Sequence, residues 1–189
     1  MSSGSGPYKE QAVASAFPKL VGTGSAGSFS VTISSTLVEV ACTGVHVSGQ
    51  PSTGNVVIKG KWELTGCVVN KPAHCSVLSP GASTGTVVTK PIKAELTSKV
   101  DLELTPESGT TFLELEFVNN GGTCAVGRSE TVTGTEPCQL ESAPAIEEAK
   151  TEHALNCGPL GGLMVGSNSV VFSTGSEASF VGTPRWRVH

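Results

Sequence analysis

The sequence predicts an all-β domain, an antiparallel β-sandwich or β-barrel of about 10–12 short strands with at most one or two short helices. Apolar and polar residues alternate in stretches such as 29–34, 38–42 and 112–118, which is the pattern of a strand with one buried face. Clusters of Gly, Pro, Asn and Ser separate these stretches and indicate turns. The composition includes 23 Gly and 43 Ser and Thr residues but only 5% aromatic and 15% charged residues. This departure from average usage favours strands and turns over helices.

The N-terminal part of the chain predicts a flexible Gly/Ser-rich segment over residues 1–25, followed by a single β-rich domain over residues 26–189. Residues 11–20 would allow one helical turn before Pro18. Residues 22–27 match G-x-G-x-x-G, but a dinucleotide site needs a strand before this motif and a helix after it. A strand-like run follows here instead, so we interpret the motif as a flexible entry to the domain.

Strands then follow one another to the end of the chain. Turn signals divide them, and the strongest hairpin signal is the Asn-Asn-Gly-Gly sequence at 119–122. Residues 142–150 are the one helix-permissive stretch within the domain. The strands expected after it cover 170–172, 178–181 and 186–188.

The chain has six cysteines, an even number that allows three disulfides in many pairings. No two of them have C-x-x-C spacing, so a redox or zinc-ribbon motif is absent from the sequence. The first two and the last two each flank a strand–turn–strand stretch. Their order therefore suggests the pairs Cys42–Cys67, Cys75–Cys124 and Cys138–Cys157. Zinc bound by scattered cysteines with His46, His74 or His153 is the alternative.

Disulfides persist in oxidising compartments, so this pairing predicts a secreted or cell-surface protein. The first residues, MSSGSGP, lack the basic start and apolar stretch of an export signal. We therefore expect that an export signal has been removed from this chain.

Several local patterns resemble a family of uncharacterised, secreted, Cys-containing β-rich proteins of soil actinobacteria. They are LTGC at 64–67, Cys75, GTVVTKPIKAEL at 85–96, LTPESGTTFLELEF at 104–117 and GTPRWRV at 182–188. The resemblance spans roughly residues 30–189. It implies export and a β-rich fold. It implies no activity, ligand or catalytic residue, because none is known for the family.

Four acidic residues fall on two expected strands joined by the 105–111 turn: Asp101, Glu103, Glu114 and Glu116. If those strands pair, the carboxylates would share one face, and glycoside hydrolases use two such groups. The simpler interpretation is a polar outer face that alternates with an apolar inner one, balanced by Lys90, Lys93 and Lys99. We prefer this interpretation. No G-x-S-x-G motif or Asp-rich loop indicates a nucleophilic serine or a calcium site.

Trp62 and Trp186 are the only tryptophans. Sugar-binding modules stack sugar rings on exposed aromatic side chains, so a carbohydrate-binding surface would use one of these two. Packing in the core is the other interpretation, and we prefer it for both.

The remaining features exclude several classes of protein. A net charge of −4 argues against a nucleic-acid partner, and no run approaches the ~18 apolar residues of a membrane span. No motif points to a metal, a cofactor or a catalytic residue. The sequence therefore predicts a non-enzymatic, extracellular structural or adhesive surface protein. Its expected partner is itself, in a coat, filament or decoration, or else a surface polymer or glycan. A carbohydrate-binding module is the alternative, followed by a secreted hydrolase.

Overall fold

The computed structural model describes residues 19–51, 57–98, 100–141, 149–158 and 161–180 of the 189-residue chain. Over these residues the protein is all-β, with sixteen strands and no helix. The strands are β1 (Leu20–Ile33), β2 (Thr36–Cys42), β3 (Gly44–Pro51), β4 (Val57–Thr65), β5 (Val68–Lys71), β6 (Cys75–Leu78), β7 (Val87–Val88), β8 (Ile92–Leu96), β9 (Asp101–Pro106), β10 (Thr111–Asn119), β11 (Ser129–Thr133), β12 (Glu136–Leu140), β13 (Glu152–Cys157), β14 (Met164–Val165), β15 (Asn168–Ser169) and β16 (Val171–Phe180).

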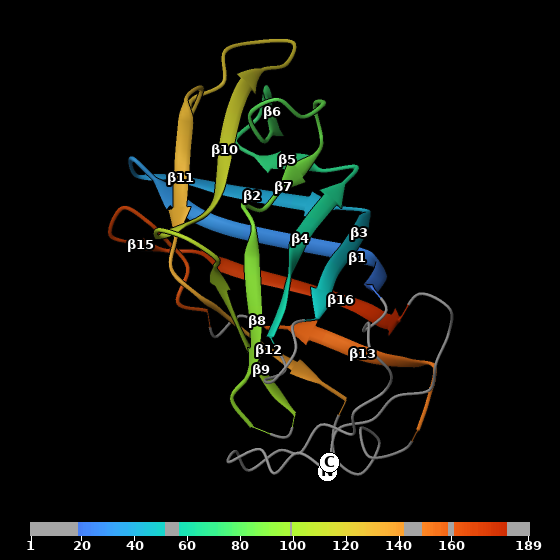
Figure 1. The fold of residues 1–189 in the computed structure, drawn as a ribbon. Coiled ribbons are helices and arrows are strands. Elements are labelled where there is room, and N and C mark those ends of the chain that lie inside the picture. The colour runs from blue at the N-terminus through green and yellow to red at the C-terminus, as the bar shows by residue number, and fades with distance from the viewer. Residues whose placement is uncertain (1–18, 52–56, 99, 142–148, 159–160, 181–189) are drawn as a thin grey trace.

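Eight of these strands close an antiparallel barrel in the order β1, β3, β4, β8, β9, β12, β13, β16. The barrel closes because β16 pairs with β13 on one side and with β1 on the other (Figure 1). The all-β, disulfide-stapled prediction is therefore confirmed, in its barrel form. The strands outnumber those expected, partly because β7, β14 and β15 are only two residues long.

The 14-residue strand β1 joins the barrel to a second region. Its first half pairs with β3, whereas its second half pairs with β2, which in turn pairs with β5. A five-stranded sheet in the order β15, β14, β11, β10, β6 forms the rest of this region. It crosses in front of β1 and β2 in Figure 1 and shares one hydrophobic core with the barrel.

The alternating sequence pattern decides which side chains enter this core. In β1, Phe29, Val31 and Ile33 are buried, while Ser28 and Thr32 on the opposite face are exposed and Ser30 is half-buried. Because successive side chains of a strand point to opposite faces, one half of each strand packs inward. Each buried side chain of this size contributes about 1.5–3 kcal/mol relative to its exposed state.

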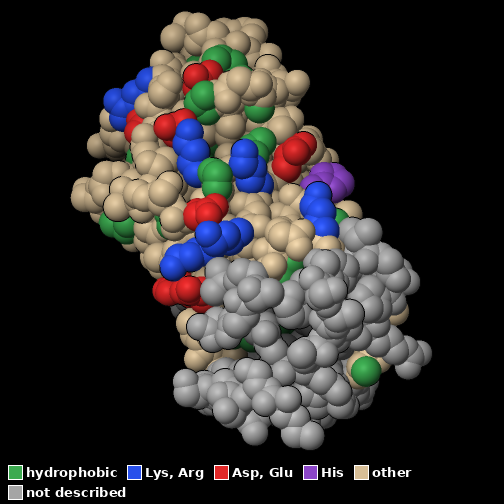
Figure 2. Space-filling view, in the orientation of Figure 1, with side chains coloured by type: hydrophobic (Ala, Val, Ile, Leu, Met, Phe, Trp, Pro, Cys, Tyr) green, Lys and Arg blue, Asp and Glu red, His purple; other side chains and the backbone are tan. Residues whose placement is uncertain are grey.

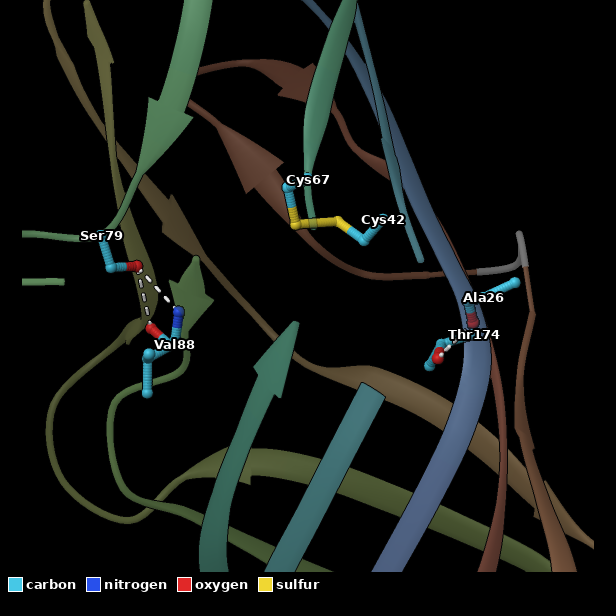
Figure 3. The surroundings of a disulfide bond; sticks show 6 residues. All are labelled: Ala26, Cys42, Cys67, Ser79, Val88 and Thr174. Carbon is cyan, nitrogen blue, oxygen red and sulfur yellow. Dashed lines mark hydrogen bonds between the residues drawn. A yellow bond between two sulfur atoms is a disulfide. The ribbon is translucent and has the colours of Figure 1, made fainter. Parts of the chain in front are cut away.

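Three disulfides link Cys42 with Cys67, Cys75 with Cys124 and Cys138 with Cys157. These are the pairs suggested by the order of the cysteines along the chain. The first joins the end of β2 to the turn after β4 (Figure 3). No cysteine remains free, so none is left to bind zinc.

The sequence predicts a flexible segment up to residue 25, but the structure places the start of the β-rich domain earlier. β1 begins at Leu20, and the supposed flexible entry at 22–27 is part of the barrel wall. A Cβ atom on Gly24 would lie 2.0 Å from the carbonyl oxygen of Gly175 in β16. These glycines therefore allow close approach between strands rather than flexibility. The register of β1 against β16 shifts between Thr23 and Ala26, where the Thr174 hydroxyl donates to the Ala26 carbonyl at 3.2 Å (Figure 3).

Other local predictions have mixed outcomes. The hairpin signal at 119–122 does join two paired strands, but β10 ends at Asn119 and β11 begins only at Ser129, so the connection is longer than a tight turn. Residues 142–148 of the helix-permissive stretch lie outside the described residues, as do 11–18, Lys99 and the expected strand at 186–188.

Candidate functional site

Where β1 pairs with β2, the outer surface of β16, β1, β2 and β5 forms one nearly uncharged sheet face. Strand register places Val171, Ser30, Glu39 and Lys71 in one row across it, and Ser173, Ser28, Ala41 and Val68 in the next. Leu37 lies opposite Thr32 beside these rows. We call this set of ten residues the neutral face. Its only charged side chains, Glu39 and Lys71, pair at 3.2 Å and cancel.

Exposed apolar side chains gather on the neutral face. Among the described residues, four large hydrophobic side chains are exposed, and Leu37 (45%), Val68 (58%) and Val171 (45%) all belong to it. The fourth, Val118, lies on β10 in the other sheet. Exposed apolar groups that cluster on one face are more informative than scattered ones, because scattered ones are normal on any protein surface.

The free sheet edges are short and partly occupied. β5 has four residues and is followed directly by Pro72, and lysine and proline on an edge discourage pairing with another strand. The main chain of β6 bonds to the following loop, with the Gly85 amide donating to the Val77 carbonyl at 2.7 Å. These edges therefore offer little free main chain for the addition of another strand.

The four carboxylates suggested for hydrolysis are not brought together. Asp101 and Glu103 lie on β9 in the barrel, and Glu114 and Glu116 lie on β10 in the second sheet, so the two strands do not pair. Asp101 accepts hydrogen bonds from Ser98 and Gln139 at 2.5 and 3.1 Å. Glu114 pairs with Lys90 at 2.6 Å. The carboxylates therefore lie on the outer surfaces of the two sheets, as expected for polar outer faces that alternate with apolar inner ones.

Trp62 is 3% exposed and lies in the core, with its ring centroid 6.3 Å from that of Phe172 at an angle of 45°. The hypothesis that Trp62 forms an exposed sugar-stacking platform is therefore wrong. Trp186, the other candidate, lies outside the described residues.

Glu136 is the functional candidate that the sequence reasoning missed. It lies on β12 with the buried residues Cys138 and Leu140, and its side chain is completely buried. Neither carboxyl oxygen has a hydrogen-bond partner within the described structure. Burial raises the pKa of Glu136 to about 8, because a charged carboxylate is costly to remove from water. The alternating Glu136, Cys138, Leu140 pattern could have indicated that this side chain points inward.

A glycine covers this carboxyl group. A Cβ atom on Gly161 would lie 2.5 Å from Oε2 of Glu136, so a larger residue there would have to displace the carboxyl group. The Gly162 amide donates to the Thr135 carbonyl at 3.1 Å and holds the covering segment in place. The arrangement buries a neutral carboxyl group under main chain.

A second acidic group at the barrel wall has partners. The buried His153 ring is hydrogen-bonded through Nδ1 to Oε2 of Glu141 at 2.8 Å, and Lys150 Nζ donates to the same oxygen at 3.3 Å. Burial alone would raise the pKa of Glu141, but the hydrogen bonds from His153 and Lys150 and their charges lower it overall. Glu136 differs because it has no such partner.

The described residues contain no group of three or more His, Cys, Asp or Glu side chains that could hold a metal ion. No helix among them is long and apolar enough to cross a membrane. Comparison with family models, with curated proteins and with solved structures finds no match to the chain.

Proposed function

We propose that the protein is a non-enzymatic extracellular structural protein that assembles with copies of itself through the neutral face. The observation that carries this proposal is the gathering of Leu37, Val68 and Val171 on one sheet face with small hydroxyl side chains between them. A face with short side chains lets two sheets pack against each other, since such side chains permit close approach.

Charge favours the neutral face as the contact between copies. The chain has a net charge of −4, so two copies repel each other over most of their surfaces. The neutral face avoids this repulsion because Glu39 and Lys71 neutralise each other. In a two-fold symmetric contact, Glu39 and Lys71 of one copy would also present each charge to the opposite charge of the other copy.

Three disulfides are consistent with an extracellular protein, because disulfides form and persist in oxidising environments. The resemblance to secreted actinobacterial proteins supports the same location. Export and self-association together fit a coat, filament or decoration on a surface.

Native mass spectrometry and sedimentation velocity over a range of concentrations test the proposal. We expect a concentration-dependent dimer or larger assembly that the double variant Leu37→Ser/Val171→Ser converts to monomer. Val118→Ser is the matched control, because it removes an exposed apolar side chain outside the neutral face. A monomer at every concentration, or equal loss of assembly in the control variant, would contradict the proposal.

A further inference from the structure

A basic hollow lies on the outer side of the β3–β4 hairpin, beside the start of β1. Its volume is about 300 Å³, and its polar lining comprises Lys19, Ser48, Gln50, Lys59, Lys61 and Glu107. We call it the basic saddle. Figure 2 shows this side of the molecule, where Lys and Arg side chains stand among acidic ones.

Two glycines contribute main chain to the lining of the hollow. Gly49 of β3 and Gly60 of β4 are direct partners in the sheet, and both line the saddle. A Cβ atom on Gly60 would lie 1.9 Å from the carbonyl oxygen of Ser48. The two backbones therefore approach each other more closely than side-chain-bearing residues would allow.

The charge of the saddle is opposite to that of the chain. Three lysines and one glutamate line it, whereas the whole chain carries a net charge of −4. Only Lys59 has an ion pair among them, with Glu107 at 2.6 Å. Lys19 and Lys61 form no ion pair with any residue of the described ranges. Two cationic side chains are therefore available to a ligand without breaking a contact.

We propose that the basic saddle binds a linear acidic polysaccharide through its carboxylate or sulfate groups. Lysines act as point charges for such groups, and the Ser48 hydroxyl can hydrogen-bond to the sugar hydroxyls. The lining residues that the structure describes include no aromatic ring and no arginine, which are the groups that stack on bases and bind nucleic-acid phosphates. The saddle is open on the protein surface, so a polymer can lie across it rather than end in it.

This site goes beyond self-assembly and does not depend on it. Binding is measured by affinity electrophoresis and by biolayer interferometry with polygalacturonate for carboxylates, dextran sulfate for sulfates and neutral dextran as a blank. We expect the wild-type protein to bind at least one of the two polyanions, more weakly at about 0.5 M salt than at about 0.05 M, because salt screens exposed charges. We expect Lys19→Gln/Lys61→Gln to weaken binding about tenfold or more.

The matched control is Arg128→Gln/Lys150→Gln, which changes the net charge equally outside the saddle. Full binding by this control, together with loss in the saddle variant, supports the proposal. No binding to either polyanion, equal loss in both variants, or stronger binding to single-stranded DNA would overturn it. The monomeric variant Leu37→Ser/Val171→Ser keeps the saddle intact, so single-site binding by that variant separates this site from the assembly proposed above.

Discussion

Glu136→Gln is expected to stabilise the protein at neutral pH and to flatten the dependence of its stability on pH. The side chain is completely buried and its carboxyl oxygens lack hydrogen-bond partners in the described structure. Glutamine keeps the shape of the side chain but cannot ionise. The substitution therefore removes the titration of this group and changes little else, since an amide is left as poorly partnered as a protonated carboxyl group.

The size of the effect follows from the pKa. Burial raises the pKa of Glu136 from 4.5 to about 8, so the folded state holds its proton at pH values where the unfolded state has lost it. The stability that this group contributes is therefore fully present below pH 4.5 and is lost as the pH rises to 8. At about 1.4 kcal/mol per pH unit, the loss reaches about 3 kcal/mol at pH 7 and about 5 kcal/mol above pH 8.

Urea unfolding at pH values from about 4 to 9 measures this difference, with midpoint and slope recorded for both proteins. The free energy of unfolding of the wild type should fall relative to that of Glu136→Gln across this range, with most of the difference present by pH 8. Glu141→Gln serves as the comparison, because the pKa of Glu141 is lowered by His153 and Lys150; its removal should lower stability above the ordinary carboxyl pKa. Parallel pH curves for wild type and Glu136→Gln would refute the assignment of a buried, unpartnered carboxyl group.

Three further predictions concern the stability of the fold. Trp62→Ala should destabilise the fold by about 3–5 kcal/mol in urea unfolding, because it empties a buried aromatic site, and wild-type tryptophan fluorescence from Trp62 should not respond to glycans. Gly60→Ala should lower the melting temperature and also weaken polyanion binding, since its Cβ would lie 1.9 Å from the Ser48 carbonyl oxygen; an unchanged melting temperature would contradict the close approach. Removal of the Cys75–Cys124 disulfide by double serine substitution should lower the free energy of unfolding by about 4 kcal/mol. This loss should exceed that for either other disulfide, because Cys75–Cys124 closes the longest loop, with a sequence separation of 49. Equal losses for all three pairs would argue against the loop-entropy explanation.

The sequence predicts the class of fold because strand alternation is a local property. Phe29, Val31 and Ile33 enter the core as their spacing indicates, and the order of the cysteines matches the disulfides in the structure. Closure into a barrel is not local. It requires β1 to pair with β16 at the other end of the chain, and no spacing within the sequence indicates that contact.

Two errors have the same physical origin. The glycines at 22–27 look like a linker in sequence, yet their role depends on the backbone of Gly175, which is distant along the chain. The strands at 101–106 and 111–119 look like a hairpin because a short turn joins them, yet β9 and β10 find their partners in different sheets. In both cases tertiary contacts override the local pattern, and local patterns alone carry no information about them.

The polar interior of the barrel gives the three disulfides a stabilising role. Besides Glu136, the inward-facing residues His153, Thr174 and Ser176 are polar and buried, and polar groups contribute less to stability than the apolar side chains they displace. The chain also has few aromatic residues to fill the barrel. Cross-links that restrict the unfolded chain offset this loss of stability without altering the interior. The Cys138–Cys157 disulfide joins directly paired residues of β12, which carries Glu136, and of the neighbouring strand β13. If the buried carboxyl group weakens the fold at neutral pH, the reduced wild type should unfold at a lower urea concentration than reduced Glu136→Gln. The gap between the two proteins should close below pH 4.5.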